Sequence, residues 1–564
     1  MAHIIPILKP GKPADVGSSY RPISLLSPVV KVLERLILPY VTTAVPQATN
    51  QHGFKPLHST TTALFPIANR VITAFNEIKP ASRVGTVAVD ISKAFDSVNL
   101  NMLMDRICDS QVHPNLIRWL GAYLRGRKAA SLYRGEKSAQ RLVHLGVPQG
   151  SVLSPALFSF FVSTIPNSAE ISSMYADDFT MSESGTISEI QDKLQADVDE
   201  LVQWATENDL KIEPTKSSLI LFTPWTSPRE LTPTVTINGI PLEVEKQLKI
   251  LGVILSRHGC YSHHVVKILK ECQTRIQILR ALAGSSWGCK KELIIMTYKA
   301  LILPLISYAC TIWYPNVCPT KIEALQRIQN SALRIATGCH VKSAVSHLHA
   351  ECKMLTIKQH LDMLCAQYLA NTLRECHPSH SIIRSLPARR SRSTPTGDFT
   401  PKKSLWVMFR EKIRPFLVEG VMPEDVYKPA LKSLHTRAVT EAIATQEPNR
   451  ILGVVPPSIN EEEEELPRPA RTTLAQLRSG FSMRLNSYKH SINLIASDLC
   501  PECGVAPHST QHLFCCNAKP TTLSAVDLWL HPKEVVAHLV NLISFDDILP
   551  ADPPAPPPPP EPPP

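Results

Sequence analysis

The sequence predicts an α+β protein, and two kinds of segment support this fold class. Residues 83–89 form a run rich in β-branched side chains that ends at Asp90, which is typical of a buried strand. Residues 174–180 place β-forming side chains on both sides of an Ala-Asp-Asp sequence, the pattern of a tight hairpin. Apolar residues then recur with helical spacing at 265–279 and 322–335. We therefore expect a sheet early in the chain, followed by a helical region.

Three carboxylates lie where the predicted strands end or turn. Asp90 follows the first strand, and Asp177 with Asp178 forms the tip of the hairpin. A lone Asp is more often a turn residue or a helix cap, but this ordered set favours a shared site. Carboxylate oxygens suit Mg²⁺, and two such ions can activate an attacking hydroxyl and stabilise a leaving oxygen. The sequence thus predicts a two-metal site, provided that the strands are neighbours.

A turn rich in Gly and Pro separates these two blocks, with the sequence LGVPQGSVLSP at residues 145–155. Its glycines, Gly146 and Gly150, allow the backbone to approach a ligand closely, and Pro155 suits the first turn of a following helix. Gln149 stands on the sharp turn, where its amide is suited to contact a base or a sugar. The plainer interpretation is a strand–turn–helix connection with no ligand.

Three blocks in this order, VDISKAFDSVN, GVPQGSVLSP and YADD, resemble the reverse transcriptase of non-LTR retrotransposons, most closely the jockey-like group. The N-terminal segment is similar to the fingers of that family. The segments NDLKIEPTKSSLILF and LKILGVILSRHG resemble its lysine-bearing palm motif and its primer-grip hairpin. The resemblance covers residues 1 to about 260 and continues more loosely to about 340. It implies a right-hand polymerase with fingers, palm and thumb.

The resemblance also implies roles for individual residues. Asp90, Asp177 and Asp178 match the catalytic carboxylates that hold two Mg²⁺ ions. The positions that match the family's nucleotide-binding residues are Arg21, Phe95, Gln149, Gly150 and Lys216.

Each nucleotide-binding match has a chemical rationale. Arg21 matches a fingers residue that contacts the incoming triphosphate, and a guanidinium binds phosphate bidentately. Phe95 matches an aromatic gate that crowds a ribose 2′-hydroxyl and so favours deoxynucleotides, a role compatible with core packing. Gln149 and Gly150 match the turn that lines the nucleotide and template pocket. Lys216 matches a lysine proposed to protonate pyrophosphate, with an ordinary surface lysine as the alternative.

Composition and the resemblance together divide the chain into segments. Residues 1–260 are predicted to be reverse transcriptase fingers and palm with incomplete fingers, and residues 261–380 a helical thumb or connection. After them we expect a basic linker at 381–403, a helical and linker region with an acidic run at 404–490, a Cys/His zinc-knuckle-like segment at 491–530 and a polyproline tail at 550–564. The acidic run, residues 461–465, is predicted to be a solvated linker rather than a metal site.

A Cys/His cluster near the C-terminus has the spacing C-x2-C-x8-H-x3-C. Three sulfurs and one imidazole suit tetrahedral Zn²⁺ in a closed structural site. The predicted ligands are Cys500, Cys503, His512 and Cys516. The choice of ligands is open, because His508 and Cys515 stand beside the chosen ones. We expect zinc to order a small segment that otherwise has little core.

The formal net charge of +10 and the pI near 8.9 favour a polyanionic partner. Residues 251–300 carry eight Lys or Arg against two Glu, which suits the phosphates of a template–primer duplex. The resemblance implies three kinds of partner: an RNA template, a DNA primer or nicked target DNA, and deoxynucleoside triphosphates.

Neither a secretory signal nor an uninterrupted transmembrane run is present in the sequence. The longest apolar stretch, residues 293–314, is interrupted by Lys299 and Pro304 and predicts a kinked core helix. Fourteen scattered cysteines favour reduced thiols. We therefore expect a protein of the nucleus and cytoplasm with no membrane partner.

Two domains of the resembled family have no counterpart in the sequence. The chain begins within the fingers motif, so we expect no endonuclease domain in it, and we find no convincing acidic set for a ribonuclease H between residues 384 and 500. We interpret the chain as a 5′-truncated copy or a fragment, whose target nick comes from another protein. The predicted function is RNA-directed DNA polymerisation. The alternative is an inactive remnant that only binds RNA or DNA; a group II intron maturase or telomerase-like polymerase is less favoured.

Overall fold

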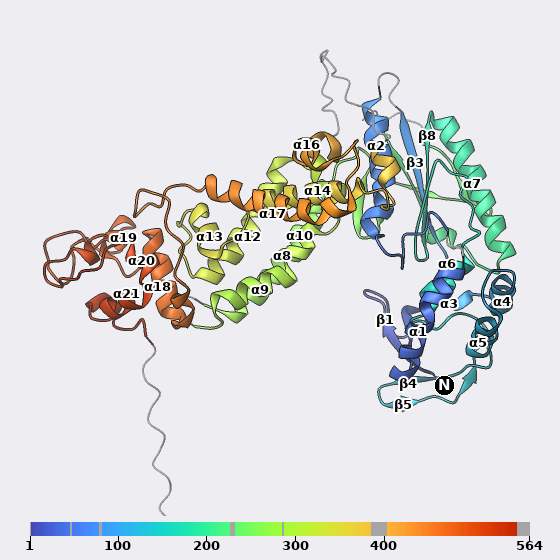
Figure 1. Ribbon diagram of the computed structural model, residues 1–564, viewed down its shortest axis with the longest axis horizontal. Helices are drawn as coiled ribbons and strands as arrows, with labels where there is room; N and C mark the ends of the chain where they lie inside the picture. The colour runs from blue at the N-terminus through green and yellow to red at the C-terminus, as the bar shows by residue number, and fades with distance from the viewer. Residues whose placement is uncertain are drawn as a thin grey trace, which may run out of the picture. The chain divides into compact units, whose positions relative to one another are not determined.

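A computed structural model describes most of the chain (Figure 1). The described residues are 2–45, 48–77, 82–225, 232–284, 287–384 and 403–549. Residues 385–402 of the predicted basic linker and all of the predicted polyproline tail lie outside them. The chain divides into two compact units, which we describe one at a time. The first comprises Met1–His264, Thr311–Asn316 and Leu369–Glu424, and the second Val265–Cys310, Val317–Tyr368 and Asp425–Pro564.

A five-stranded sheet forms the centre of the first unit. Its strand order is β12-β9-β3-β8-β7, with β3 hydrogen-bonded to antiparallel neighbours on both sides. The strands are β3 (Arg83–Asp90), β7 (Ile171–Tyr175), β8 (Asp178–Gly185), β9 (Ser218–Phe222) and β12 (Glu243–Glu245). The predicted strand before Asp90 and the predicted hairpin around the Asp pair are therefore both confirmed, and the fold is α+β.

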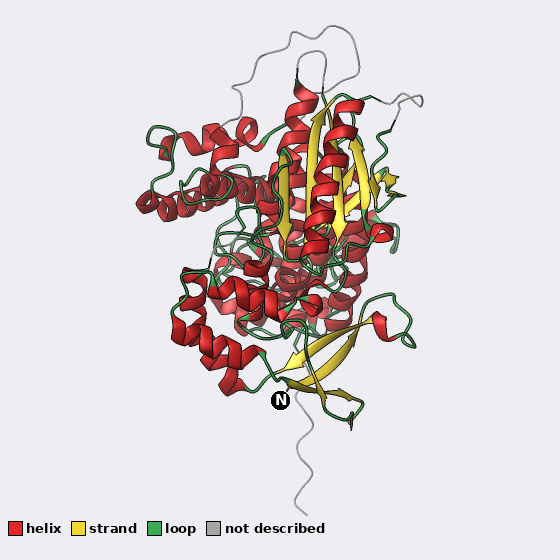
Figure 2. Ribbon diagram, turned by 90° about the vertical axis from the view of Figure 1, so that its right-hand side faces the viewer, coloured by secondary structure: helices red, strands yellow, loops and turns green. Residues whose placement is uncertain are grey.

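Helices cover both faces of this sheet (Figure 2). On one face, α7 (Ile187–Glu207) approaches so closely that a Cβ added to Gly85 would lie 2.4 Å from Ile190. On the opposite face, the Ser173 hydroxyl donates to Ala63 O in α2 (Thr60–Asn76) over 2.9 Å. Alternating side chains of β3 thus enter two apolar layers, which hold the strand in a dry, rigid setting.

A second five-stranded sheet lies in the N-terminal part of the first unit. Its strands are β1 (Ala2–Leu8), β2 (Tyr20–Leu25), β4 (Lys128–Tyr133), β5 (Glu136–Lys137) and β6 (Arg141–Leu142). The helices beside it in the sequence are α1 (Pro28–Ala44), α3 (Ala94–Ser97), α4 (Leu100–Cys108), α5 (Pro114–Leu124) and α6 (Ser154–Phe161). The helix predicted after the Gly/Pro turn is α6, and Pro155 stands in its first turn.

The remaining elements of the first unit include two short hairpins. Strands β13 (Gln247–Ile250) and β14 (Val253–Ser256) form an antiparallel pair over the segment that resembles a primer grip. The other elements are β10 (Thr236–Ile237), β11 (Ile240–Pro241), α11 (Cys310–Trp313), α15 (His380–Arg384) and α16 (Leu405–Ile413).

The second unit is helical in all the regular elements that the structure describes there. They are α8 (Ser262–Leu282), α9 (Lys291–Leu301), α10 (Leu303–Ser307), α12 (Pro319–Thr337), α13 (Val345–Cys352), α14 (Ile357–Thr372), α17 (Glu424–Ala444), α18 (Arg468–Ser479), α19 (Asn486–Ser491), α20 (Asp527–Leu530) and α21 (Pro532–Leu539). Both helices predicted from apolar spacing are confirmed as α8 and α12. The second ends at Gly338, whose φ of 69° is the left-handed cap that glycine adopts readily.

The apolar stretch that resembled a membrane span is broken in the structure. Helix α9 ends at Leu301 and α10 begins at Leu303, with Pro304 in its first turn, as the predicted kink requires. Among the described residues, no single helix has both the length and the apolar composition to cross a bilayer. The broken pair Lys291–Ser307 and Cys310–Asn316 meets that test together, by length and composition only.

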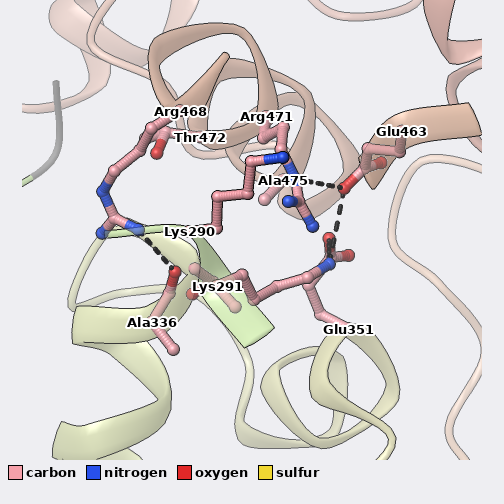
Figure 3. Close-up of a pocket in the computed structure, with 10 residues that line it drawn as sticks. Lys290, Lys291, Ala336, Glu351, Glu463, Arg468, Arg471, Thr472 and Ala475 are labelled. Carbon is pink, nitrogen blue, oxygen red and sulfur yellow. Dashed lines mark hydrogen bonds and ion pairs between the residues drawn. The ribbon is translucent and has the colours of Figure 1, made fainter. Parts of the chain in front are cut away.

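The acidic run does not behave as a solvated linker throughout, and for Glu463 that prediction is wrong. Residues Glu461–Glu465 form a short 3-10 helix, and Glu463 is only 2% exposed. Its carboxylate lies 3.4 Å from Lys291 Nζ and 3.8 Å from Arg471 Nε (Figure 3). A lone buried carboxylate would be very costly, so these cations explain why one acid of the run turns inward.

Arg478 completes this buried ion network. Its guanidinium is fully buried, lies 2.8 Å from Glu351 Oε1, and also pairs with Glu463. It donates two further hydrogen bonds, of 2.9 and 2.5 Å, to Leu528 O. The network thus joins α13, α18 and the acidic run with the segment at Leu528.

The Cys/His segment is not poor in core, contrary to the expectation from its sequence. Leu513 and Phe514 follow His512 directly and are both buried. They belong to an apolar cluster that also includes Leu474 of α18, Trp529 of α20 and Phe545. The sequence reasoning missed this core because its members come from segments on both sides of the cysteines.

Replacing Glu463 with Gln should destabilise the folded chain by about 3–5 kcal/mol, the usual cost of breaking a buried ion pair. The reason is that Lys291 and Arg478 would remain buried with one carboxylate fewer between them. Chemical denaturation followed by circular dichroism measures the change. Glu464→Gln is the matched control, because Glu464 is an exposed acid of the same run. Equal stability of the two variants would contradict the buried network.

Candidate active site

The site begins with the pairing of Asp90 and Asp178. These residues lie directly opposite each other at the end of the antiparallel β3–β8 ladder. Side chains of directly paired residues point to the same face of a sheet, so the two carboxylates are neighbours. The turn that joins β7 to β8 consists of Ala176 and Asp177, so Asp177 directly precedes Asp178, the first residue of β8. The structure therefore brings together the three acids that the sequence singled out; their role as metal ligands stays a prediction.

Burial and neighbouring negative charge both raise the pKa values of the hairpin acids. Partial burial, followed by the charges of Asp177 and Asp90, raises the pKa of Asp178 to about 6. Partial burial and then Asp90 raise the pKa of Asp177, while Arg21 on β2 acts to lower it. Both hairpin acids keep an exposed side. A concentrated, accessible negative charge of this kind attracts any cation, a metal ion as well as a proton.

The backbone and side chain of Asp90 are both held from the segment after α7. The Asp90 amide donates to Ser217 Oγ over 3.2 Å, and the Glu213 amide donates to Asp90 O over 3.0 Å. Lys216, at the end of the short helix Pro214–Lys216, places its ammonium 3.2 Å from Asp90 Oδ2. A cationic group thus already contacts this carboxylate. Three carboxylates with solvent-facing oxygens also make a donor set that fits a hard divalent cation.

The Gly/Pro turn is fastened against β2. The Ser24 amide donates to Gln149 O over 2.7 Å, and Gly150 has a φ of 111°. A Cβ at Gly150 would lie 2.7 Å from Ser24 O, so glycine is required there for the close approach. The Gln149 side chain donates to Asp96 Oδ1 over 3.0 Å. The turn that carries Gln149 is thus bonded to β2, the strand that carries Arg21.

Phe95 has features of both a gate and a core residue. Its ring stacks on Phe158 with the centroids 4.3 Å apart, and it meets the edge of Phe54 at 6.2 Å. The residue is only half-buried, so part of the ring remains accessible. Packing on two aromatic rings fixes the position of Phe95, and an aromatic gate requires a fixed position.

Sequence reasoning missed two buried polar residues that support the site. Glu34 in α1 is fully buried and accepts hydrogen bonds of 2.6 Å from the Val152 amide and 2.6 Å from the Tyr123 hydroxyl. It therefore holds the turn that carries Gln149. Gln51, also fully buried, contacts the hairpin turn. An acid within the apolar stretch of α1 was a usable signal for Glu34, whereas nothing local in the sequence marked Gln51.

A second candidate site lies in the second unit. The ligand atoms of Cys500, Cys503, His512 and Cys516 all lie within 4.8 Å of one another, the same set that the spacing predicted. The neighbouring candidates are engaged elsewhere. His508 is buried and accepts a hydrogen bond of 3.2 Å from the Asn486 amide, and the exposed Cys515 thiol donates to Gln511 O over 3.5 Å.

The local backbone prepares this cluster for a cation. Amide groups of Val505 and Ala506 point at the Cys503 sulfur and, with smaller contributions from His512 and Cys516, lower the pKa of Cys503 to about 6. The thiolate is the metal-binding form of cysteine, so this environment favours metal ligation. Cys503 Sγ lies 3.4 Å from His512 Nε2, which places two unlike donors side by side. Tetrahedral Zn²⁺ accepts this combination of donors.

Comparison with known proteins agrees with the geometry of the first unit. Residues 7–255 match the family described as reverse transcriptase (RNA-dependent DNA polymerase). This part of the chain is a reverse transcriptase domain. The match includes the whole central sheet, the Gly/Pro turn, all three acids of the candidate site and the second sheet except for most of β1. The prediction of a reverse transcriptase is therefore confirmed for these residues.

The reverse transcriptase domain and the region after it are similar to polymerases of jockey-like mobile elements. The chain is 31% identical over 409 residues to the RNA-directed DNA polymerase from mobile element jockey of Drosophila funebris, covering 70% of this chain and 43% of that protein. It is 29% identical over 396 residues to the probable RNA-directed DNA polymerase from transposon X-element of Drosophila melanogaster, covering 68% of this chain and 43% of that protein. The chain thus spans less than half the length of these relatives.

Among solved structures, apo telomerase from Candida tropicalis is similar at 11% identity, covering 60% of this chain and 57% of that chain with a TM-score of 0.33. A similarity of this size supports no detailed comparison, so the account of the site rests on the geometry above.

Replacing Asp178 with Asn should raise the melting temperature in Mg²⁺-free buffer at pH 7.5. The pKa of Asp178 in the folded chain is about 6, above the usual Asp value of about 4, so ionisation opposes folding above pH 6. The gain should be largest above pH 6 and vanish below about pH 4, where the wild-type side chain is protonated in both the folded and the unfolded state. Scanning fluorimetry across this pH range measures it.

The control for this measurement is Asp192→Asn, which removes an exposed carboxylate of α7 outside the site. It should give no gain that depends on pH in this way. A stabilisation by Asp178→Asn that stays constant between pH 3 and 8 would contradict the raised pKa assigned to Asp178.

Proposed function

We propose that this chain is an RNA-directed DNA polymerase that adds deoxynucleotides to a primer 3′-hydroxyl on an RNA template. The register pairing of Asp90 with Asp178, with Asp177 in the adjoining turn, is the observation that carries the proposal. The reverse transcriptase match over residues 7–255 supports it, as does the similarity to the RNA-directed DNA polymerases from jockey and the X-element.

Asp90 and Asp177, with Asp178 in support, are proposed to hold two Mg²⁺ ions. Bound divalent cations supply activation of the attacking hydroxyl and stabilisation of the leaving oxygen in phosphoryl transfer. The acids themselves contribute a fixed cluster of oxygen ligands whose mutual repulsion is relieved by a cation. Lys216, 3.2 Å from Asp90, is proposed to give a proton to the departing pyrophosphate.

The proposed nucleotide pocket is formed by residues around the acids. The positive charge of Arg21 favours the ionised form of Asp177, and its guanidinium presents a planar set of hydrogen-bond donors suited to a triphosphate. Gln149, fixed by Asp96, and the backbone at Gly150 are proposed to line the pocket for base and sugar. Phe95 is proposed to crowd a ribose 2′-hydroxyl. The proposed partners are an RNA template, a DNA primer or nicked target DNA, and deoxynucleoside triphosphates.

The Cys/His cluster is proposed to be a structural zinc knuckle. All four donors come from the protein, which leaves no open position and suits a structural ion. Because the adjoining Leu513 and Phe514 belong to an apolar core, the ion is proposed to fix the loop Cys500–Cys503 against that core rather than to order the whole segment.

Replacing Asp177 with Asn should reduce primer extension on an RNA template by about 10³-fold, because a metal ligand supplies several kcal/mol of charge stabilisation in such reactions. A fluorescent primer annealed to RNA, with Mg²⁺ and all four deoxynucleotides, measures the rate. Asp192→Asn should extend like the wild type. Binding of the primer–template without extension, unchanged by Asp177→Asn, would instead support an inactive nucleic-acid-binding remnant.

Purified chain should contain about one Zn²⁺ per molecule, and Cys503→Ser should lose it because a closed tetrahedral site needs all four ligands. Metal content is measured by inductively coupled plasma mass spectrometry after dialysis. Cys515→Ser is a matched control, since this neighbouring cysteine lies outside the cluster, and it should keep the ion. Zinc retained by Cys503→Ser, or lost by Cys515→Ser, would show that the ligand set is wrong.

A further inference from the structure

The turn that carries Asp177 has a backbone conformation that needs support. Ala176, the first of the two turn residues, has a φ of 58°. This left-handed region is unfavourable for a residue with a Cβ and is the usual territory of glycine. The turn also brings the negative charges of Asp177 and Asp178 close to Asp90, and mutual repulsion opposes that arrangement. The native geometry therefore depends on contacts from outside the hairpin.

The contacts come from the side-chain amide of Gln51. Its Oε1 accepts from the Ala176 amide over 3.0 Å, and its Nε2 donates to Ala176 O over 3.2 Å. One carboxamide thus satisfies both backbone groups of the strained residue. Gln51 is fully buried, so water does not compete for these bonds.

The orientation of the Gln51 amide is itself fixed. Gln51 Oε1 also accepts from the Gly53 amide over 2.7 Å. A Cβ at Gly53 would lie 2.6 Å from Ala176 N, so glycine allows this segment to touch the turn. Backbone bonds hold the segment against β7: the His52 amide donates to Met174 O over 2.7 Å, and the Met174 amide donates to Asn50 O over 2.9 Å.

We infer that Gln51 is a positioning residue that holds the Ala176–Asp177 turn in the geometry required for cation binding by the three acids. The inference rests on the proposed function. The hydrogen bonds of the Gln51 side chain go to the backbone of Ala176 and to the Gly53 amide, so Gln51 acts through the turn backbone rather than on a carboxylate. Supporting groups behind metal ligands typically change metal affinity by about 10–100-fold when removed. The effect should therefore appear in metal binding and in the mobility of the hairpin.

The chain offers a closely matched control for this interaction. In the same unit, Gln195 Oε1 accepts from the Thr236 amide over 2.8 Å, and Gln195 Nε2 donates to Thr236 O over 3.1 Å. This is the same two-bond contact of a glutamine with one backbone residue, made between α7 and β10, away from the acids. Gln195→Met therefore removes an equivalent contact with no expected consequence for the site.

The experiment compares Gln51→Met, Gln195→Met and Asp177→Asn in the full chain. Mn²⁺ serves as the probe, and its binding is followed by electron paramagnetic resonance in chelator-free buffer. Asp177→Asn should abolish Mn²⁺ binding at the site. Gln51→Met should weaken the same binding by about 10–100-fold. Gln195→Met should bind like the wild type. Hydrogen–deuterium exchange of the peptide covering residues 174–180 should become at least about 10-fold faster in Gln51→Met alone.

Unchanged Mn²⁺ affinity or unchanged exchange in Gln51→Met would overturn the inference. Should that variant fail to fold, Gln51→Glu keeps the acceptor for Ala176 and Gly53 but lacks the donor for Ala176 O, and the same two readouts apply to it. If the wild-type chain bound no Mn²⁺, or if Asp177→Asn left its Mn²⁺ binding unchanged, the proposed function would be overturned. Faster hydrogen–deuterium exchange in Gln51→Met would then still show that Gln51 stabilises the turn. Failure of the proposed function can therefore be distinguished from failure of the inference about Gln51.

Discussion

The candidate site depends on the register between β3 and β8. Because side chains alternate across a sheet, a slip of one residue would move Asp178 to the opposite face from Asp90. Buried contacts on both faces fix the register. On one face, Thr86 and Ser182 pair through a hydroxyl–hydroxyl bond of 2.8 Å, and on the other Gly85 admits Ile190. The chemistry at the end of the ladder thus depends on packing several residues away from it.

The acids of the site lower the stability of the metal-free folded chain and are required for the proposed reaction. Burial and neighbouring charge raise the pKa of both Asp177 and Asp178, so their ionised forms oppose folding. Cationic groups and buried hydrogen bonds from separate segments offset this cost. Lys216 forms an ion pair with Asp90, and the charge of Arg21 favours the ionised form of Asp177. The Gln51 amide donates a hydrogen bond to Ala176 O in the turn between β7 and β8. Strain of this kind at a functional site is sustained by a rigid surround.

Local pattern predicted the strands, the hairpin, helices α8 and α12 and the Cys/His ligand set, because each of these is encoded by neighbouring residues. The errors concern burial decided by distant partners. Glu463 resembles its four exposed neighbours in sequence, and only the cations of Arg478, Lys291 and Arg471 make its burial tolerable. Gln51 escaped notice for the same reason, since its partner Ala176 lies 125 residues away. The spacing of residues within a local motif carries no information about such distant pairs.

The buried ions of the second unit specify an arrangement more than they add stability. A buried ion pair roughly offsets its own desolvation, whereas loss of one partner leaves an uncompensated charge. Arg478 meets two carboxylates and the Leu528 carbonyl at once, and any displacement of α13, α18 or that segment breaks at least one of these contacts. Apolar side chains in the same positions would tolerate a shift of register, because dispersion contacts are not directional. The C-terminal core that carries the Cys/His cluster is therefore held to the α9 and α13 helices in one defined arrangement.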